Sequence, residues 1–394
     1  MNGTIYMPVG EVCSSISDTY REKKNMVTLI NTSDVLEGRV LNHERVPNSN
    51  LKGQFKKTFQ RDDILYSEIR PQNRRFAYVD FSPIDYIAST KLMVIRAKKD
   101  VVSPKYLYYF LKNSSTVAEL QLLAETRSGT FPQITFSEVA NLTIPVPSLA
   151  VQEVIVQTMQ CLEDKITCNE QINDNLEQQA QAIYHERFET VSPNDLPSDW
   201  RIVTLGEVAT ISNKSFNPLK EPEILLEHYS IPAFDEARFP VFELSTSIKS
   251  NKFIIDASCF MISKLNPTTK RVWKPYCLTG NAACSTEFIV YKAKDQSITD
   301  FLYSVIDSGS FSDFMCSHVT GSTGSRQRTT PSDTLSYELI LPSEDELAEF
   351  QSLVSPMYAQ MRINAIENDK LKRLRDSLLP KLMSGEIDVS AVQL

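Results

Sequence analysis

The sequence lacks the patterns that most enzymes and metal-binding proteins require. None of its seven cysteines forms a CxxC pair and its four histidines are scattered, so neither a disulfide framework nor a zinc site is expected. No glycine-rich phosphate loop ends in Lys. The Asn-Pro-Pro-aromatic segment and the glycine-rich turn of an S-adenosylmethionine methyltransferase are also missing. We therefore expect no catalytic residue, no metal ligand and no cofactor site in this chain.

Long apolar runs are missing as well. The chain has no stretch of 18 apolar residues and no recognisable signal peptide. We therefore expect a cytoplasmic protein without a membrane partner.

Glycine and proline are absent from residues 149–189, so nothing in this stretch breaks a helix. Its apolar residues recur at threes and fours, which indicates the narrow seam of a coiled coil rather than the wide stripe of a helix on a globular core. Such a helix would reach roughly 60 Å and would need a partner to bury its seam. The partner predicted for it is a second long helix over 345–379.

The two helices belong to an internal repeat. At an offset of 195 residues, Asn169 falls on Asn364 and Leu176 falls on Leu371. Upstream, the segment Val9–Val12 matches Leu205–Val208 at an offset of 196. The chain is therefore predicted to be two tandem copies of one unit, each a globular domain followed by a long helix. The predicted boundaries are 1–149, 150–190, 191–342 with a linker at 191–199, and 343–394.

The seam prediction is specific enough to name its residues. We expect them at Ile155, Leu162, Ile166, Asn169, Leu176, Ile183, Met357, Met361, Asn364, Leu371 and Leu378. Asn169 and Asn173, with their counterparts Asn364 and Asn368, occupy or border seam positions, where polar residues commonly fix register. If Asn169 and Asn364 meet there, replacing both by Leu should raise stability. The alternative is that these asparagines face solvent or another protein.

Charge divides unevenly along the chain. The net charge of −8 comprises +4 on residues 1–149, −6 on 150–190 and −3 on each of 191–342 and 343–394. The acidic surplus of the first helix suits contact with protein, and the modest charge of the globular segments argues against a tight DNA binder that acts alone.

Each copy has two basic or hydroxyl-rich loops at corresponding places. One loop follows a predicted strand, and the other comes before the long helix. The guanidinium, amide and hydroxyl groups of such loops can reach phosphates or base edges. The alternative for any one residue is a solvated loop. The candidate DNA-binding residues are Arg70, Gln72, Asn73, Arg74, Arg75, Arg127, Ser128, Thr130 and Gln133 in the first copy, and Lys264, Thr268, Thr269, Lys270, Arg271, Ser325, Arg326, Gln327 and Arg328 in the second.

Four segments, in order, give the chain a family resemblance. They are IPVPSLAVQ before the first helix, NEQINDNLEQQAQAIYHERF within it, LPSDWRIVTLGEVA after it and LRDSLLPKLMSGEID near the C-terminus. With the two diverged domains, they resemble the specificity (S) subunit of type I restriction–modification systems. Val151 stands where an acidic residue is commoner, and the second copy of the first segment (LPSEDELAEF) departs further from the pattern.

The resemblance implies a fold and a role. The fold would be α+β: two tandem α/β target recognition domains, each followed by a long helix, with the helices in an antiparallel coiled coil and a pseudo-two-fold internal repeat. Each domain would read one half of a bipartite, asymmetric site in double-stranded DNA. The helices would set the spacing and dock two modification subunits.

The same resemblance places the chemistry in other chains. The modification subunits would hold S-adenosylmethionine, and restriction subunits would add ATP- and Mg-dependent translocation and cleavage, so this chain would be non-catalytic. Two alternatives stay open at this point: a coiled-coil scaffold or ligand-binding protein unrelated to DNA, and an enzyme such as a nuclease or methyltransferase.

Overall fold

The computed structural model describes residues 4–22, 24–49, 51, 53–127, 131–321 and 327–389, without the side chain of Arg127. Its chain divides into two compact units, one of residues 1–166 with 371–394 and one of residues 167–370. Both long helices contribute to both units, so the boundaries predicted from the sequence, which assign each helix to a separate segment, stay a prediction. No helix in the described ranges is both long enough and apolar enough to cross a membrane.

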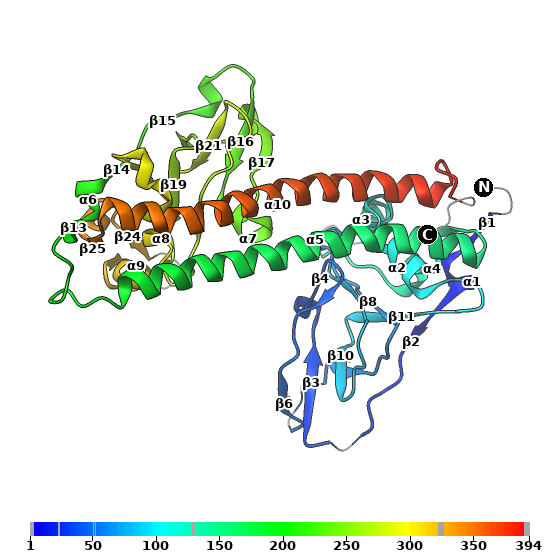
Figure 1. Cartoon of the computed structure of the whole chain (residues 1–394). Helices are drawn as coiled ribbons and strands as arrows, with labels where there is room; N and C mark the ends of the chain where they lie inside the picture. The colour runs from blue at the N-terminus through cyan, green and yellow to red at the C-terminus, as the bar shows by residue number, and fades with distance from the viewer. Residues whose placement is uncertain are drawn as a thin grey trace. The chain divides into compact units, whose positions relative to one another are not determined.

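The first unit places β-rich layers on helices (Figure 1). Its strands are β1 (Ile5–Pro8), β2 (Cys13–Ile16), β3 (Met26–Ile30), β4 (Val35–Leu36), β5 (Arg39–Val40), β6 (Arg45–Pro47), β7 (Phe55–Lys57), β8 (Ile64–Ser67), β9 (Phe76–Tyr78), β10 (Tyr86–Ser89), β11 (Leu92–Ala97) and β12 (Thr143–Val146). Its short helices are α1 (Val9–Val12), η1 (Thr32–Asp34), η2 (Pro71–Asn73), α2 (Pro104–Lys112), α3 (Ser114–Arg127) and α4 (Phe136–Asn141).

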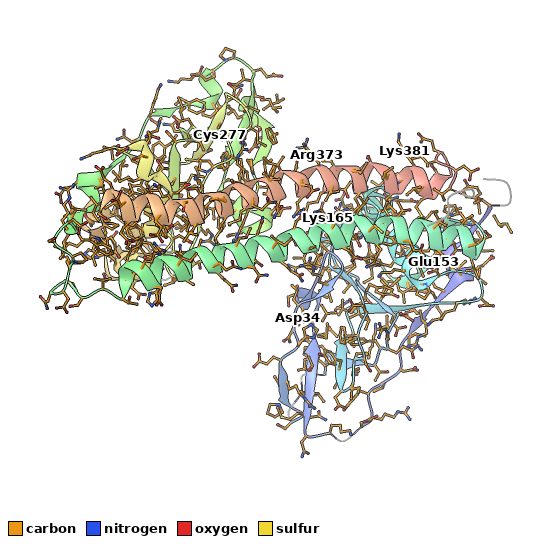
Figure 2. All side chains as sticks on the ribbon, viewed as in Figure 1. Asp34, Glu153, Lys165, Cys277, Arg373 and Lys381 are labelled. Atoms are coloured by element: carbon orange, nitrogen blue, oxygen red, sulfur yellow. The ribbon has the colours of Figure 1, made fainter. Side chains whose placement is uncertain are left out.

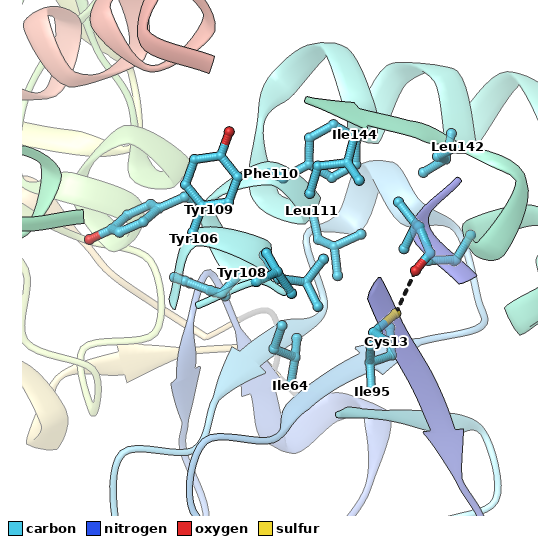
Figure 3. Close-up of a cluster of buried hydrophobic side chains, with 14 of the residues drawn as sticks. Cys13, Ile64, Ile95, Tyr106, Tyr108, Tyr109, Phe110, Leu111, Leu142 and Ile144 are labelled. Carbon is cyan, nitrogen blue, oxygen red and sulfur yellow. Dashed lines mark hydrogen bonds between the residues drawn. The ribbon is translucent and has the colours of Figure 1, made fainter. Parts of the chain in front are cut away.

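Two four-stranded sheets form the first unit's body, in the orders β2-β11-β8-β9 and β6-β3-β10-β7. The period-two alternation of residues 63–70 predicts a half-buried strand. That prediction is wrong for β8, because Ile64, Leu65, Tyr66 and Ser67 are all buried. Ile64 and Tyr66 pack in one apolar cluster with the α2 residues, whereas Leu65 packs in another on the opposite face. Figure 3 shows the first cluster, where the Cys13 thiol donates to the main-chain oxygen of Val9 at 3.2 Å.

The second unit has a matching set of elements. Its strands are β13 (Arg201–Thr204), β14 (Ala209–Ile211), β15 (Ser215–Phe216), β16 (Leu225–Tyr229), β17 (Val241–Leu244), β18 (Lys252–Ile254), β19 (Cys259–Ser263), β20 (Val272–Trp273), β21 (Ala282–Ser285), β22 (Phe288–Ala293), β23 (Val319–Thr320), β24 (Arg328–Thr329) and β25 (Glu338–Leu341). Its short helices are α6 (Leu205–Val208), η4 (Pro218–Lys220), α7 (Ile231–Ala237), η5 (Ser245–Ser247), η6 (Gln296–Ile298), α8 (Thr299–Ile306), α9 (Gly309–Ser317) and η8 (Pro331–Ser336).

Strand register confirms the repeat residue by residue. Sheet β2-β11-β8-β9 has its counterpart in β14-β22-β19-β20. Ser67 pairs with Leu92 in the first and Ser263 with Phe288 in the second, both shifted by 196. The outer sheets share the order β6-β3-β10-β7 and β17-β16-β21-β18, and β15 adds a fifth strand in the second.

Each of the two short matching segments contains a glycine that lies close to a neighbouring element. A Cβ built on Gly10 would lie 3.0 Å from the Ala140 Cβ, and one on Gly206 would lie 3.2 Å from both the Cβ and the main-chain oxygen of Leu335. The backbone of α1 therefore approaches α4 as closely as α6 approaches η8, and an added methyl group would crowd either contact.

The long helices are α5 (Leu149–Tyr184), continued by the π-helical turn η3 (His185–Glu189), and α10 (Glu344–Ser384). Helix α10 runs through Pro356 and Pro380, each of which removes one backbone donor without ending the helix. The prediction that the helices make only a narrow seam is wrong. Met159 of α5 and Leu382 of α10 belong to the first unit's core, and Tyr184 and Phe350 to the second's, because both helices also carry apolar residues beside the seam.

The predicted seam residues differ in burial. Ile155, Ile166, Asn169 and Asn364 are buried, Leu162, Ile183, Met357, Met361 and Leu378 are partly buried against the cores, and Leu176 and Leu371 are half-buried. The α+β fold of two repeats, each followed by a long helix, is confirmed.

Four asparagines join the helices within the second unit. Asn169 donates to Asn368 at 2.9 Å, and Asn364 donates to Asn173 at 2.8 Å. Asn169 also donates to Glu367 at 2.8 Å. The offset of 195 residues relates Asn169 to Asn364 and Asn173 to Asn368. The helices run antiparallel, because the pairs are Asn169 with Asn368 and Asn173 with Asn364. The hydrogen bonds thus join Asn169 to Asn368 rather than to Asn364, its counterpart in the repeat, as antiparallel packing requires.

This pairing predicts which double substitution is tolerated. Asn169→Leu with Asn368→Leu removes both members of one pair, whereas Asn169→Leu with Asn364→Leu removes one member of each of the two pairs. We expect the second variant to be less stable than the first by about 1–3 kcal/mol, because it breaks two of these hydrogen bonds instead of one. Denaturant titration of both variants measures the difference, and equal unfolding free energies would contradict the pairing.

Candidate nucleic-acid interface

The first candidate loop begins where β8 ends. The Ser67 hydroxyl accepts from the Ile69 N–H at 3.0 Å and turns the chain out of the sheet. Arg70 and Arg74 then adopt left-handed backbone conformations on either side of η2, with φ of 43° and 51°. Side chains other than Gly, Asn and Asp seldom adopt this conformation, and such residues concentrate at functional sites.

The second candidate loop of this domain returns beside the first. Ile69 forms a bridge with Gln133, and the Arg70 N–H donates to the Pro132 carbonyl at 3.1 Å. The structure thus brings together the two segments that the sequence singled out separately. Ser128, Thr130 and the Arg127 side chain lie outside the described residues.

The cationic side chains of the first loop contact mostly neutral groups. The Arg70 guanidinium lies over the Phe131 ring, 6.0 Å from its centroid. Arg74 donates to the Ser114 hydroxyl at 3.0 Å and approaches the Glu37 carboxylate at 3.9 Å. Arg75 donates to the Ser33 carbonyl at 3.0 Å. The side chains of Gln72 and Asn73 are exposed.

The second domain builds the same frame. The Leu265 N–H donates to the Ser263 hydroxyl at 3.1 Å, and Asn266 has a φ of 47°. Leu265 forms a bridge with Arg328, and the Asn266 N–H donates to the Gln327 carbonyl at 2.9 Å. Asn266 thus occupies the place of Arg70. Ser325 and Arg326 lie outside the described residues.

Most cations of the second loop face carboxylates instead. Arg271 makes two hydrogen bonds to Asp235, at 2.6 and 2.9 Å. Arg328 makes two to Glu287, at 2.9 and 3.2 Å. Lys270 lies 2.8 Å from Asp307. Thr268 and Thr269 are exposed beside them.

Charges at one corresponding position are exchanged between the domains. In the first, Glu68 pairs with Lys91 at 3.4 Å, and Lys91 also donates to Gln133 at 3.1 Å. In the second, Lys264 replaces Glu68 and Glu287 replaces Lys91. The scaffold of the loop is therefore kept while its surface chemistry differs.

Asn266 is a candidate residue that the site prediction omitted. Its sequence signal was the pattern Ser263–Leu265–Asn266, which matches Ser67–Ile69–Arg70 at 196. The left-handed conformation of both residues then identifies one structural position that carries different side chains. An Arg there suits guanine and an Asn suits adenine.

Asp307 gives this loop a pH dependence. Its side chain is buried, burial raises its pKa to about 6, and the Lys270 ammonium opposes that rise. Because the folded pKa exceeds the ordinary value of 3.8, the ionised carboxylate destabilises the fold, and this cost develops as pH rises from 3.8 through about 6.

Asp307→Asn should therefore leave the unfolding free energy nearly unchanged at pH 4. At pH 7 it should raise that energy by about 1–3 kcal/mol, since one pKa unit is worth about 1.4 kcal/mol. Denaturant titrations at both pH values test this. The same change at pH 4 and pH 7 would show that the carboxylate is not strained by burial.

Sequence comparisons find similar proteins. Residues 6–178 match the family described as "Type I restriction modification DNA specificity domain". The chain is 28% identical to the type I restriction enzyme HindI specificity subunit of Haemophilus influenzae, over 92% of this chain and 94% of that protein. The chain is thus similar over nearly its whole length to a type I restriction–modification specificity subunit, and residues 6–178 match the corresponding domain family.

Further specificity subunits resemble the chain. The MjaIX specificity subunit of Methanocaldococcus jannaschii is 25% identical over 78% of this chain and 76% of its own length. The crystal structure of the S subunit from M. genitalium shares the fold, with a TM-score of 0.55, 15% identity and coverage of 98% of this chain and 97% of that one.

Proposed function

We propose that this chain is the DNA sequence-recognition subunit of a type I restriction–modification complex, and that each domain reads one half of a bipartite, asymmetric site. One observation carries this proposal. The same loop frame occurs twice, with left-handed Arg70 in one copy and left-handed Asn266 in the other. A duplicated scaffold with divergent surface chemistry suits two half-sites of different sequence.

The proposed partners supply the chemistry. Modification subunits, two per chain, would bring S-adenosylmethionine and methyl transfer, and restriction subunits would bring ATP- and Mg-dependent cleavage. The net charge of −6 on residues 150–190 favours protein rather than DNA as the neighbour of α5. The action of such a complex on chromosomal DNA would place it in the cytoplasm.

The contacts within the loops separate two roles for the predicted residues. Arg70, Gln72, Asn73, Thr268 and Thr269 present exposed polar groups and are the proposed readers. By contrast, Arg75 and Arg271 are held by groups of their own domain, and we infer that they shape the loops. The contact of all eighteen predicted residues with DNA stays a prediction.

Loop substitutions should relax one half-site each. Arg70→Ala with Asn73→Ala should weaken recognition of the first half, and Thr268→Ala with Thr269→Ala that of the second. A residue that contacts a base is worth about 1–3 kcal/mol and relaxes one position, whereas a phosphate contact weakens all sequences alike. The measurement is sequencing of methylated bases in cells that carry the complete system.

Arg75→Ala and Arg271→Ala are the matched controls. They remove a positive charge from the same loops but should lower the melting temperature of the domain without shifting one base of the recognised sequence. If both double variants degraded the same half-site, the assignment of one half to each domain would be wrong.

The proposed non-catalytic role of the chain can be tested separately. The purified chain should bind DNA weakly and with strong dependence on salt, and should neither methylate nor cleave it. Methyl transfer by the isolated chain in a single turnover would overturn the non-catalytic role.

A further inference from the structure

A second apolar cluster joins the two sheets of the second unit. In it Tyr229 of the outer sheet and Phe234 of α7 pack with Trp273 and Phe288 of the inner sheet, apart from the cluster that holds Tyr184 and Phe350 of the long helices. Apolar packing thus connects the outer sheet to the helices through the inner sheet. A direct attachment to the helices would fix the orientation of the outer sheet more firmly.

Tyr276 lies at such an attachment. Its N–H and that of Cys277, which Figure 2 labels, donate to the Tyr229 hydroxyl at 2.8 and 2.9 Å. The Tyr229 hydroxyl in turn donates to the buried carboxylate of Glu227 at 2.5 Å. Both Glu227 and Tyr229 belong to β16, in the interior of the outer sheet. Tyr276 is therefore anchored to that sheet through its main chain.

Tyr276 also connects to α7 and to both long helices. Its hydroxyl donates to the carbonyl of Arg238, the left-handed residue that ends α7, at 3.0 Å. The Arg238 guanidinium pairs with Glu177 of α5 at 2.8 Å. From the other helix, Arg362 of α10 donates to the Tyr276 carbonyl at 3.0 Å. Figure 1 labels α7 in the second unit.

These four residues, Glu177, Arg238, Tyr276 and Arg362, form a clamp between the outer sheet and the helix pair. Burial raises the pKa of Tyr276 to about 12, so its hydroxyl stays a donor at neutral pH. Each bond is partly exposed and modest in strength, because solvent screens such contacts. Their value lies in geometry, since they fix a point that is separate from the apolar core.

We infer that the Tyr276 clamp sets the orientation of the second domain on the helices and thereby restricts the spacer length between the half-sites. This inference rests on the proposed function. Arg238, Tyr276 and Arg362 are positioning residues in it, and none of them belongs to the candidate reading loops. A domain held only through its inner core could rock and accept half-sites that are one base pair nearer or farther.

The test uses the complex of the full chain with its modification subunits. Its substrates carry both half-sites with the natural spacer, or with one base pair more or fewer. For Arg238→Gln with Arg362→Gln, methylation at the altered spacers relative to the natural one should rise about tenfold, which corresponds to about 1.4 kcal/mol. The preferred bases in each half-site should stay unchanged. Lys370→Gln, an exposed charge loss on α10, is the control.

Several outcomes are distinguishable. An unchanged spacer profile in the double variant, with the clamp broken, would overturn the inference. If the double variant loses its melting transition, Tyr276→Phe replaces it, since it removes only the bond to Arg238 and should broaden the profile less. Loss of half-site sequence preference would contradict a pure positioning role. Absence of sequence-specific methylation by the unmodified complex would refute the proposed function itself.

Discussion

The antiparallel packing of α5 on α10 is the constraint on which the rest of the structure depends. Each unit's core contains residues of both helices: Met159 and Leu382 in the first, Tyr184 and Phe350 in the second. Neither globular half completes its core with the helix of its own repeat alone. A slip of one helix along the other would break the hydrogen bonds of the buried Asn169 and Asn364 to Asn368 and Asn173, so these pairs favour the observed register.

The repeat could be predicted because short segments of the two copies match at offsets of 195 or 196 residues. One such match is Val9–Val12 with Leu205–Val208. Those offsets reproduce the pairing of Ser67 with Leu92 and of Ser263 with Phe288. The alternating pattern of residues 63–70 gave a wrong prediction for β8. Periodicity reports where the apolar side chains lie, but it does not reveal a second layer that covers the other face of the strand. Antiparallel helix packing likewise made Asn368, not Asn364, the neighbour of Asn169.

The candidate site was predictable in its location but not in its chemistry. The loops at 70–75 and 266–271 stood out by composition, and the bridges of Ile69 and Leu265 bring the second pair of loops to them. Ion pairs such as Arg271 with Asp235 join residues 36 apart in the sequence, and only the fold reveals them. These ion pairs matter because a cation that is already paired with a carboxylate binds a phosphate less strongly. The arginines of the loop at 70–75 contact mostly neutral oxygens and a ring, so less of their positive charge is neutralised within the domain.

Lengthening both helices together tests the central claim, that the paired helices space two reading domains, most directly. Four residues added after Ile166 and four after Lys370 extend both helices by about 6 Å and turn the chain beyond them by only about 40°, so the seam can re-form. Because duplex DNA rises about 3.4 Å per base pair, the account predicts methylation at sites whose spacer is one or two base pairs longer, with both half-site sequences unchanged. Methylation that keeps the original spacer in this variant would contradict the account.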